Sequence, residues 1–111
     1  MILVDTSVWI DHFRNGNARL RELLQEGEVA IHPMVLGELA CGNLSRRPGT
    51  LRLLDRLPRI PQAPDHLVLQ SIDSRRLFGK GIGWIDAHLL TASLLASVPL
   101  WTLDHRLERL V

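Results

Sequence analysis

Short apolar runs that alternate with longer helical segments are the feature that most limits the fold of this 111-residue chain. Residues 2–4, 29–31 and 99–103 are short, largely apolar stretches, and each predicts a brief buried strand. Strands that are separated by helices pair in parallel more readily than in hairpins. The sequence therefore predicts an α/β fold with a small, mainly parallel sheet, and its length suits a single domain over residues 1–111.

Capping and helix-breaking residues divide the first half of the chain into three expected helices. The first covers residues 8–13 and ends near Gly16. Asn17 is placed to cap the second helix, and Gly27 to end it. Pro33 suits the first turn of the third helix, because its missing amide hydrogen is not needed there.

The second half of the chain contains three further helical segments before its last strand. A polar turn over residues 45–49 is expected to precede a helix at residues 51–57. Asp65 is expected to cap the next helix, and a glycine-rich stretch, residues 79–83, leads into an apolar helix over residues 84–96. The expected inner face of the Asp65 helix consists of Leu67, Leu69, Ile72 and Leu77.

Composition limits the cellular setting more than the chemistry. No apolar run approaches the roughly 18 to 20 residues that cross a bilayer, so we expect a cytoplasmic protein without membrane contact. The single cysteine, Cys41, cannot form an internal disulfide, and we expect it to be buried as a small apolar residue. The net charge is only +1, so no strong overall field attracts a polyanion.

Four acidic residues stand where chemistry is expected. Asp5 and Asp104 each follow a predicted strand directly, and the carboxyl ends of parallel strands form the usual ligand-binding edge. Asp86 lies in the first turn of the apolar helix over residues 84–96, and Glu38 lies within the apolar third helix. A carboxylate in apolar surroundings is costly unless it is paired, protonated or bound to a cation.

Each of these acids also has a simpler explanation. Asp5, Asp86 and Asp104 are all placed to cap helices, and Glu38 could point to solvent. The four together favour a metal site, because Mg²⁺ and Mn²⁺ prefer oxygen ligands and relieve the repulsion between carboxylates. A metal-bound water has a lowered pKa and can attack a phosphodiester.

Four segments in the same order resemble PIN-domain nucleases, and within them the toxins of VapBC toxin–antitoxin pairs. They are MILVDTSVWID at residues 1–11, VLGELA at 35–40, GIGWIDAHLL at 81–90 and LWTLD at 100–104. The resemblance extends over nearly the whole chain. It implies a PIN-like three-layer α/β/α sandwich and an endoribonuclease that depends on Mg²⁺ or Mn²⁺.

The resemblance also implies roles for individual residues. Asp5, Glu38, Asp86 and Asp104 match the family's catalytic, metal-binding acids, with Asp5 and Asp86 as the expected direct ligands. Nearby hydroxyl groups are expected to orient the acids and metal-bound water, and the residues concerned are Thr6, Ser7 and Thr102. Similar proteins cleave RNA, are inhibited by a cognate antitoxin and often form homodimers. They usually continue past the segment at residues 107–111, so we expect a truncated C-terminal end or a short subgroup.

Three basic residues are the candidates for contacts with RNA phosphates: Arg75, Arg76 and Lys80. A solvated helix face explains them equally well.

Two other functions remain open at this stage. A catalytically silent PIN-like module could bind RNA or a partner protein, although such a module would not need all four acids or a divalent ion. A receiver-like phosphoacceptor domain expects paired acids after the first strand and a later lysine after a strand. Here Asp5 is the only acid in its segment, and the only lysine, Lys80, lies in the glycine-rich stretch.

Overall fold

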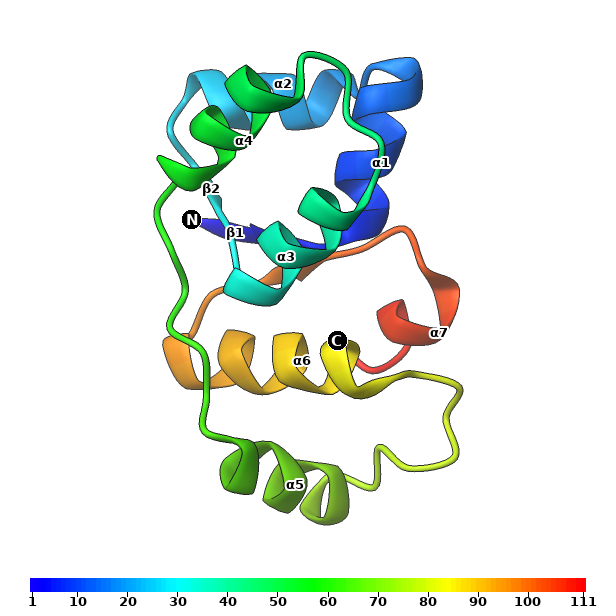
Figure 1. Cartoon of the computed structure of the whole chain (residues 1–111). Coiled ribbons are helices and arrows are strands. Elements are labelled where there is room, and N and C mark those ends of the chain that lie inside the picture. Colours follow the sequence, from blue (N-terminus) through cyan, green and yellow to red (C-terminus); the bar gives the residue numbers. More distant parts are fainter.

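A three-stranded parallel sheet lies at the centre of the computed structural model, which describes residues 1–111 (Figure 1). The strands are β1 (Ile2–Val4), β2 (Val29–Ala30) and β3 (Leu100–Trp101), in the order β2-β1-β3. Leu3 pairs with Ala30 on one side and with Leu100 on the other. The three predicted strands and their parallel pairing are therefore confirmed, and β1 is the central strand.

Helices cover both faces of this sheet (Figure 1). They are α1 (Thr6–Asn15), α2 (Ala18–Gln25), α3 (Pro33–Cys41), α4 (Arg47–Asp55), α5 (Asp65–Ser74), α6 (Trp84–Ala96) and α7 (His105–Glu108). In Figure 1, α1, α2 and α4 lie above the sheet and α6 lies below it, with α5 packed on the outer side of α6. The expected three-layer α/β/α arrangement is confirmed. None of the helices has the length and apolar character needed to cross a membrane.

The core explains why such a short sheet is stable. Leu3 and Val4 of β1 are completely buried, as expected for a strand that is covered on both faces. Val8 from α1 and Leu89 from α6 belong to the same buried apolar cluster. The central strand is therefore held by helix packing on both sides as well as by its two parallel neighbours.

The predicted starts of α2 and α3 and the predicted end of α2 are confirmed, whereas α1 begins at Thr6, two residues before its expected start. The Asn17 side chain accepts a hydrogen bond of 2.9 Å from the Leu20 amide at the start of α2. Gly27 follows the end of that helix with a φ of 69°, a conformation that favours glycine. Pro33 occupies the first turn of α3, where it removes no hydrogen bond.

Two expectations about local structure in the second half are wrong. Helix α4 begins at Arg47, inside the predicted turn, because Pro48 is compatible with a first helical turn and Thr50 donates to the Ser45 carbonyl. Asp65 does not cap α5, because it is the first residue of that helix and its side chain caps no amide. Its carboxylate instead lies 3.2 Å from Nε2 of His88.

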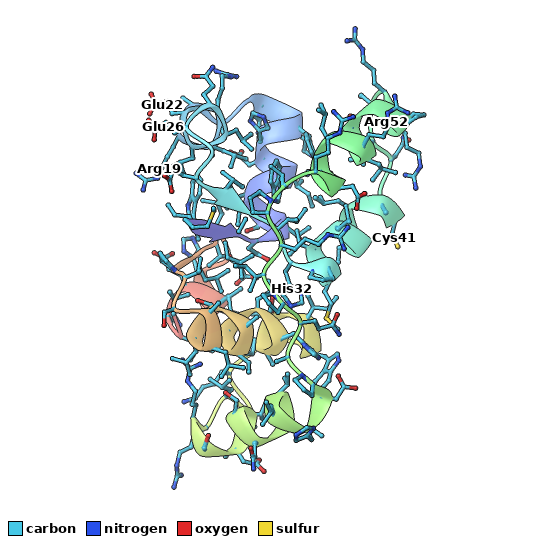
Figure 2. All side chains as sticks on the ribbon, turned by 90° about the vertical axis from the view of Figure 1, so that its left-hand side faces the viewer. Arg19, Glu22, Glu26, His32, Cys41 and Arg52 are labelled. Atoms are coloured by element: carbon cyan, nitrogen blue, oxygen red, sulfur yellow. The ribbon has the colours of Figure 1, made fainter.

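Two expectations about burial are also wrong. Leu69 is exposed, whereas its neighbour Val68 is completely buried, because α5 packs against α6 along a narrow stripe. Cys41 is exposed, because it is the last residue of α3 and lies at the outer edge of the molecule (Figure 2). Both outcomes depend on how the helices pack, which the sequence pattern does not specify.

Two histidines are completely buried next to one another. His32 lies between the sheet layer and α6 (Figure 2), and its ring centroid is 6.2 Å from that of His88. His32 Nδ1 accepts a hydrogen bond from the Met34 amide at the start of α3. Burial, together with the nearby His88, lowers the pKa of His32 to about 4. His32 is therefore a neutral capping residue at physiological pH.

Replacing His32 by Asn should reduce the acid sensitivity of the fold. The asparagine side chain would still offer an acceptor to the Met34 amide but could not be protonated. An unfolded chain protonates His32 near the ordinary pKa of 6.5, whereas the folded chain resists protonation down to about pH 4. The unfolded state thus binds more protons in this window, and stability falls as the pH drops through it, by about 3 kcal/mol in total.

Urea unfolding at several pH values between neutrality and about pH 4 measures this difference. The free energy of unfolding should fall less steeply in His32→Asn than in the parent protein. Parallel curves for the two proteins would show that His32 is not the titrating group.

Candidate active site

The sheet topology brings the first and last acids together. Asp5 directly follows β1, and Asp104 lies a few residues after β3. These two strands are parallel neighbours, so both acids lie at the same carboxyl edge of the sheet. The Asp5 amide also donates to the Trp101 carbonyl over 2.9 Å, which extends the pairing to the residue that carries the first acid.

Asp5 is the buried acid of the group, with only 6% of its surface exposed. It is the N-cap residue of α1, but its carboxylate accepts no amide hydrogen bond from that helix. Its Oδ2 instead accepts hydrogen bonds of 2.7 Å from both the Ser7 and the Thr102 hydroxyl groups. Capping therefore does not explain this carboxylate, which has no cationic side chain within ion-pair distance.

The two hydroxyl groups connect the start of α1 to the end of β3. Ser7 Oγ and Thr102 Oγ1 lie 3.2 Å apart, and both contact the same oxygen of Asp5. Ser7 Oγ accepts the Leu103 amide over 3.0 Å, and Thr102 Oγ1 accepts the Asp104 amide over the same distance. The position of the last acid is thus fixed relative to the first by side chains that both of their segments supply.

Glu38 reaches the same site from α3. Thr6, which follows Asp5 in the chain, donates its hydroxyl hydrogen to Glu38 Oε1 over 2.7 Å. Glu38 is exposed, so of the two alternatives left open by the sequence, the one in which it points to solvent is confirmed. Its position depends on the hydrogen bond from Thr6, which links the acid on α3 to the segment that carries Asp5.

Asp86 and Asp104 do act as helix caps, as the simpler explanation expected. Asp86 Oδ2 accepts the Gly83 amide over 3.2 Å at the start of α6. Asp104 Oδ1 accepts two amides of α7, from Arg106 over 2.9 Å and from Leu107 over 3.3 Å. These bonds hold each carboxylate in a defined orientation, and capping does not exclude a further role.

All four acids share one arrangement. Each carboxylate uses a single oxygen for its hydrogen bonds to the protein, and its second oxygen accepts none. Burial raises the pKa of Asp86, and the charges of the other three acids raise it further, against a lowering effect of the Gly83 amide. The negative charges of Asp5, Asp104 and Glu38 therefore all act on the carboxylate of Asp86.

The donor set suits a hard divalent cation that keeps part of its water shell. No three His, Cys, Asp or Glu side chains are arranged to hold one ion directly. Mg²⁺ usually keeps several waters and takes only one or two carboxylate ligands from a protein. Four oriented carboxylates with free oxygens match that requirement, because some can contact the ion and the others can accept hydrogen bonds from its waters.

A cleft beside Glu38 was not predicted from the sequence. Ile10, Phe13 and Arg14 of α1 line one side of it, and Asn43 is among the residues from the α3–α4 segment that line it as well. The sequence did contain a signal for this cleft, because Ile10, Phe13 and Arg14 have the i, i+3, i+4 spacing of residues on one helix face. The cleft offers a cation and an exposed aromatic ring next to one of the four acids.

No ion pair or hydrogen bond joins the acids to the basic residues that were expected to contact RNA. Arg75 donates over 3.4 Å to the Leu110 carbonyl, and neither Arg76 nor Lys80 forms an ion pair. All three side chains are exposed. The structure therefore brings the four acids and their three hydroxyl partners together, and the contact of these basic residues with RNA stays a prediction.

The fold and the site define an α/β protein with a group of four acids at the carboxyl edge of its parallel sheet. Residues 2–111 match the PIN domain family, and the chain belongs to that family. It is 47% identical over 109 residues to Ribonuclease VapC32 of Mycobacterium tuberculosis, in both strain CDC 1551 / Oshkosh and strain ATCC 25618 / H37Rv. The alignment covers 97% of this chain and 88% of each relative.

Removing the Thr102 hydroxyl should impair the site more than the fold. Thr102→Val keeps the side-chain shape but loses the bonds to Asp5 and to the Asp104 amide. We expect a loss of activity of about 10- to 100-fold and a loss of unfolding free energy of about 1–2 kcal/mol. Thr91→Val is the matched control, because Thr91 is buried and bonded to a helix carbonyl. Equal activity losses in both variants would contradict this role of Thr102.

Replacing Asp86 by Asn should stabilise the metal-free protein at neutral pH. The raised pKa means that the folded state binds the Asp86 proton more tightly than the unfolded state does. Stability is therefore lost as the pH rises from the ordinary pKa of Asp86 through the raised one. The asparagine side chain removes the charge and can still accept the Gly83 amide.

Thermal unfolding with and without Mg²⁺ measures both parts of this expectation. Without Mg²⁺, the melting temperature of Asp86→Asn should exceed that of the parent at pH 7 but not near pH 3. Added Mg²⁺ should stabilise the parent more than the variant. A variant that is less stable than the parent at pH 7 would contradict the raised pKa of Asp86 and its causes, burial and the nearby acids.

Proposed function

We propose that this chain is a metal-dependent endoribonuclease, the toxin of a toxin–antitoxin pair, which hydrolyses RNA phosphodiester bonds with Mg²⁺ or Mn²⁺. The observation that carries the proposal is the shared arrangement of the four acids, in which each carboxylate is fixed through one oxygen and free at the other. This arrangement suits a divalent ion and its waters, and it does not require a histidine or serine nucleophile.

In this proposal two of the acids bind the cation and the other two orient the water that attacks the phosphodiester. Asp5 and Asp86 would hold the cation, because Asp5 is fixed by two hydroxyl groups and the pKa of Asp86 is raised by burial and by the charges of the other acids. Glu38 and Asp104 would accept hydrogen bonds from water and orient it. The bound ion would lower the pKa of a water and neutralise charge on the scissile phosphate.

Support for RNA as the substrate comes from the relative, whose name is Ribonuclease VapC32. We extend that substrate class to this chain on the basis of their 47% identity. We further propose a cognate antitoxin as inhibitor, a homodimer as the assembled form and the cytoplasm as the location. Size-exclusion chromatography coupled to light scattering measures the assembly directly.

Replacing Asp5 by Asn should abolish cleavage and leave the fold intact. The asparagine side chain could still accept a hydroxyl hydrogen but would carry no charge to hold a cation. We expect RNA cleavage to fall by well over the roughly 100-fold that follows the loss of an outer partner of a metal ligand. Asp73→Asn on the exposed face of α5 is the matched control and should cleave as the parent does.

The assay uses purified, antitoxin-free protein and a mixed cellular RNA pool, with Mg²⁺, with Mn²⁺ and with EDTA. Discrete fragments that require both the divalent ion and Asp5 are the expected result. If folded parent protein binds RNA but cuts none of it in any condition, the chain is a binding module. Cleavage that persists in Asp5→Asn or in EDTA would contradict the assigned site.

A further inference from the structure

Arg106 lies unusually close to a glycine in the segment before α6. Gly81 has a φ of 82°, and a Cβ atom placed on it would lie 2.8 Å from Cδ of Arg106 and 3.3 Å from Nε. Both distances are shorter than ordinary van der Waals contact. The Arg106 side chain therefore lies directly against the Gly81 backbone, in space that any other residue at position 81 would fill.

This contact joins the two segments that carry Asp86 and Asp104. Arg106 is two residues after Asp104, and its backbone amide donates to the carboxylate of that acid. Gly81 is two residues before Gly83, whose amide donates to Asp86. The Arg106 side chain is thereby held against the segment that leads to Asp86, while its backbone amide is bonded to Asp104.

The guanidinium group itself has no protein partner. The Arg106 side chain forms no ion pair and no hydrogen bond, and it is exposed. Its five N–H donors are thus available, and guanidinium groups bind phosphate oxygens in a bidentate manner. Arg75, by contrast, donates to the Leu110 carbonyl. The four carboxylates repel the phosphates of an approaching RNA, and a positively charged side chain near the carboxylates reduces this repulsion.

We propose that Arg106 binds an RNA phosphate next to the scissile one, and that Gly81 provides the backbone surface that holds its side chain in place. The proposal rests on the proposed ribonuclease function and identifies how that site would hold its substrate. Arg106 would be a substrate-binding residue with no direct role in the attack on phosphorus. It differs from the three basic residues that the sequence indicated, since its side chain lies against Gly81 and its backbone amide is bonded to Asp104.

RNA binding can be measured separately from cleavage in the Asp5→Asn background. The probe is a short fluorescent single-stranded RNA, and fluorescence anisotropy gives its affinity at several salt concentrations with Mg²⁺ present. Adding Arg106→Gln should weaken binding about tenfold or more. A plot of the logarithm of the RNA-binding constant against the logarithm of the salt concentration should also become less steep, by about 0.7. This is the value for one phosphate contact on a single strand. Arg109→Gln, which removes an exposed arginine at the end of α7, should change neither quantity.

A pair of glycine variants tests the contribution of the contact. Gly79 and Gly81 both have positive φ values, 69° and 82°, so alanine strains the backbone at either position. A Cβ at Gly79 meets nothing within 4 Å, whereas a Cβ at Gly81 displaces Arg106. Gly81→Ala should therefore weaken RNA binding as Arg106→Gln does, and Gly79→Ala should not. Combining Gly81→Ala with Arg106→Gln should cause no further loss.

The outcomes separate this proposal from the function on which it rests. If the parent cleaves RNA and Arg106→Gln binds it with unchanged affinity and salt slope, the role of Arg106 is wrong and the nuclease remains. If Gly79→Ala and Gly81→Ala weaken binding equally, the specific contact with Gly81 is wrong. If the parent cleaves no RNA but Arg106→Gln reduces binding, the phosphate contact stands and the hydrolytic function is wrong.

Discussion

The carboxylate of Asp5, held by the hydroxyl groups of Ser7 and Thr102, is the interaction on which the rest of the site depends. It joins the end of the central strand to the start of α1 and to the segment after β3, so it fixes the geometry of the sheet edge. A buried carboxylate without a cationic partner is unfavourable. The hydroxyl groups offset part of this cost and leave one carboxylate oxygen free for an ion.

The other acids are positioned by equally local means. Glu38 is tied to the hydroxyl group of Thr6, and Asp86 and Asp104 are oriented by the amides that they cap. Each bond holds a negative charge near others of the same sign, and burial together with these charges raises the pKa of Asp86. Such a group of acids is most stable with a cation among them, so the same interactions that strain the metal-free site would favour ion binding.

The sequence predicted the parts of the site that follow from topology and missed those that depend on packing. Asp5 and Asp104 were predictable together, because parallel neighbouring strands end at the same edge. The exposure of Cys41 could not be predicted, since it depends on how α3 is oriented against its neighbours. The contact of Arg106 with Gly81 depends on the backbone conformation of residues 79–83, which no periodicity specifies.

The central claim is that these four acids together hold a divalent cation, and crystals saturated with Mn²⁺ test it most directly. An anomalous difference map shows where the ion lies without reference to activity. We expect a peak among the four carboxylates, within bonding distance of Asp5 or Asp86 and with waters that reach the remaining acids. A map from a Mn²⁺-saturated crystal with no peak among these carboxylates would contradict the account.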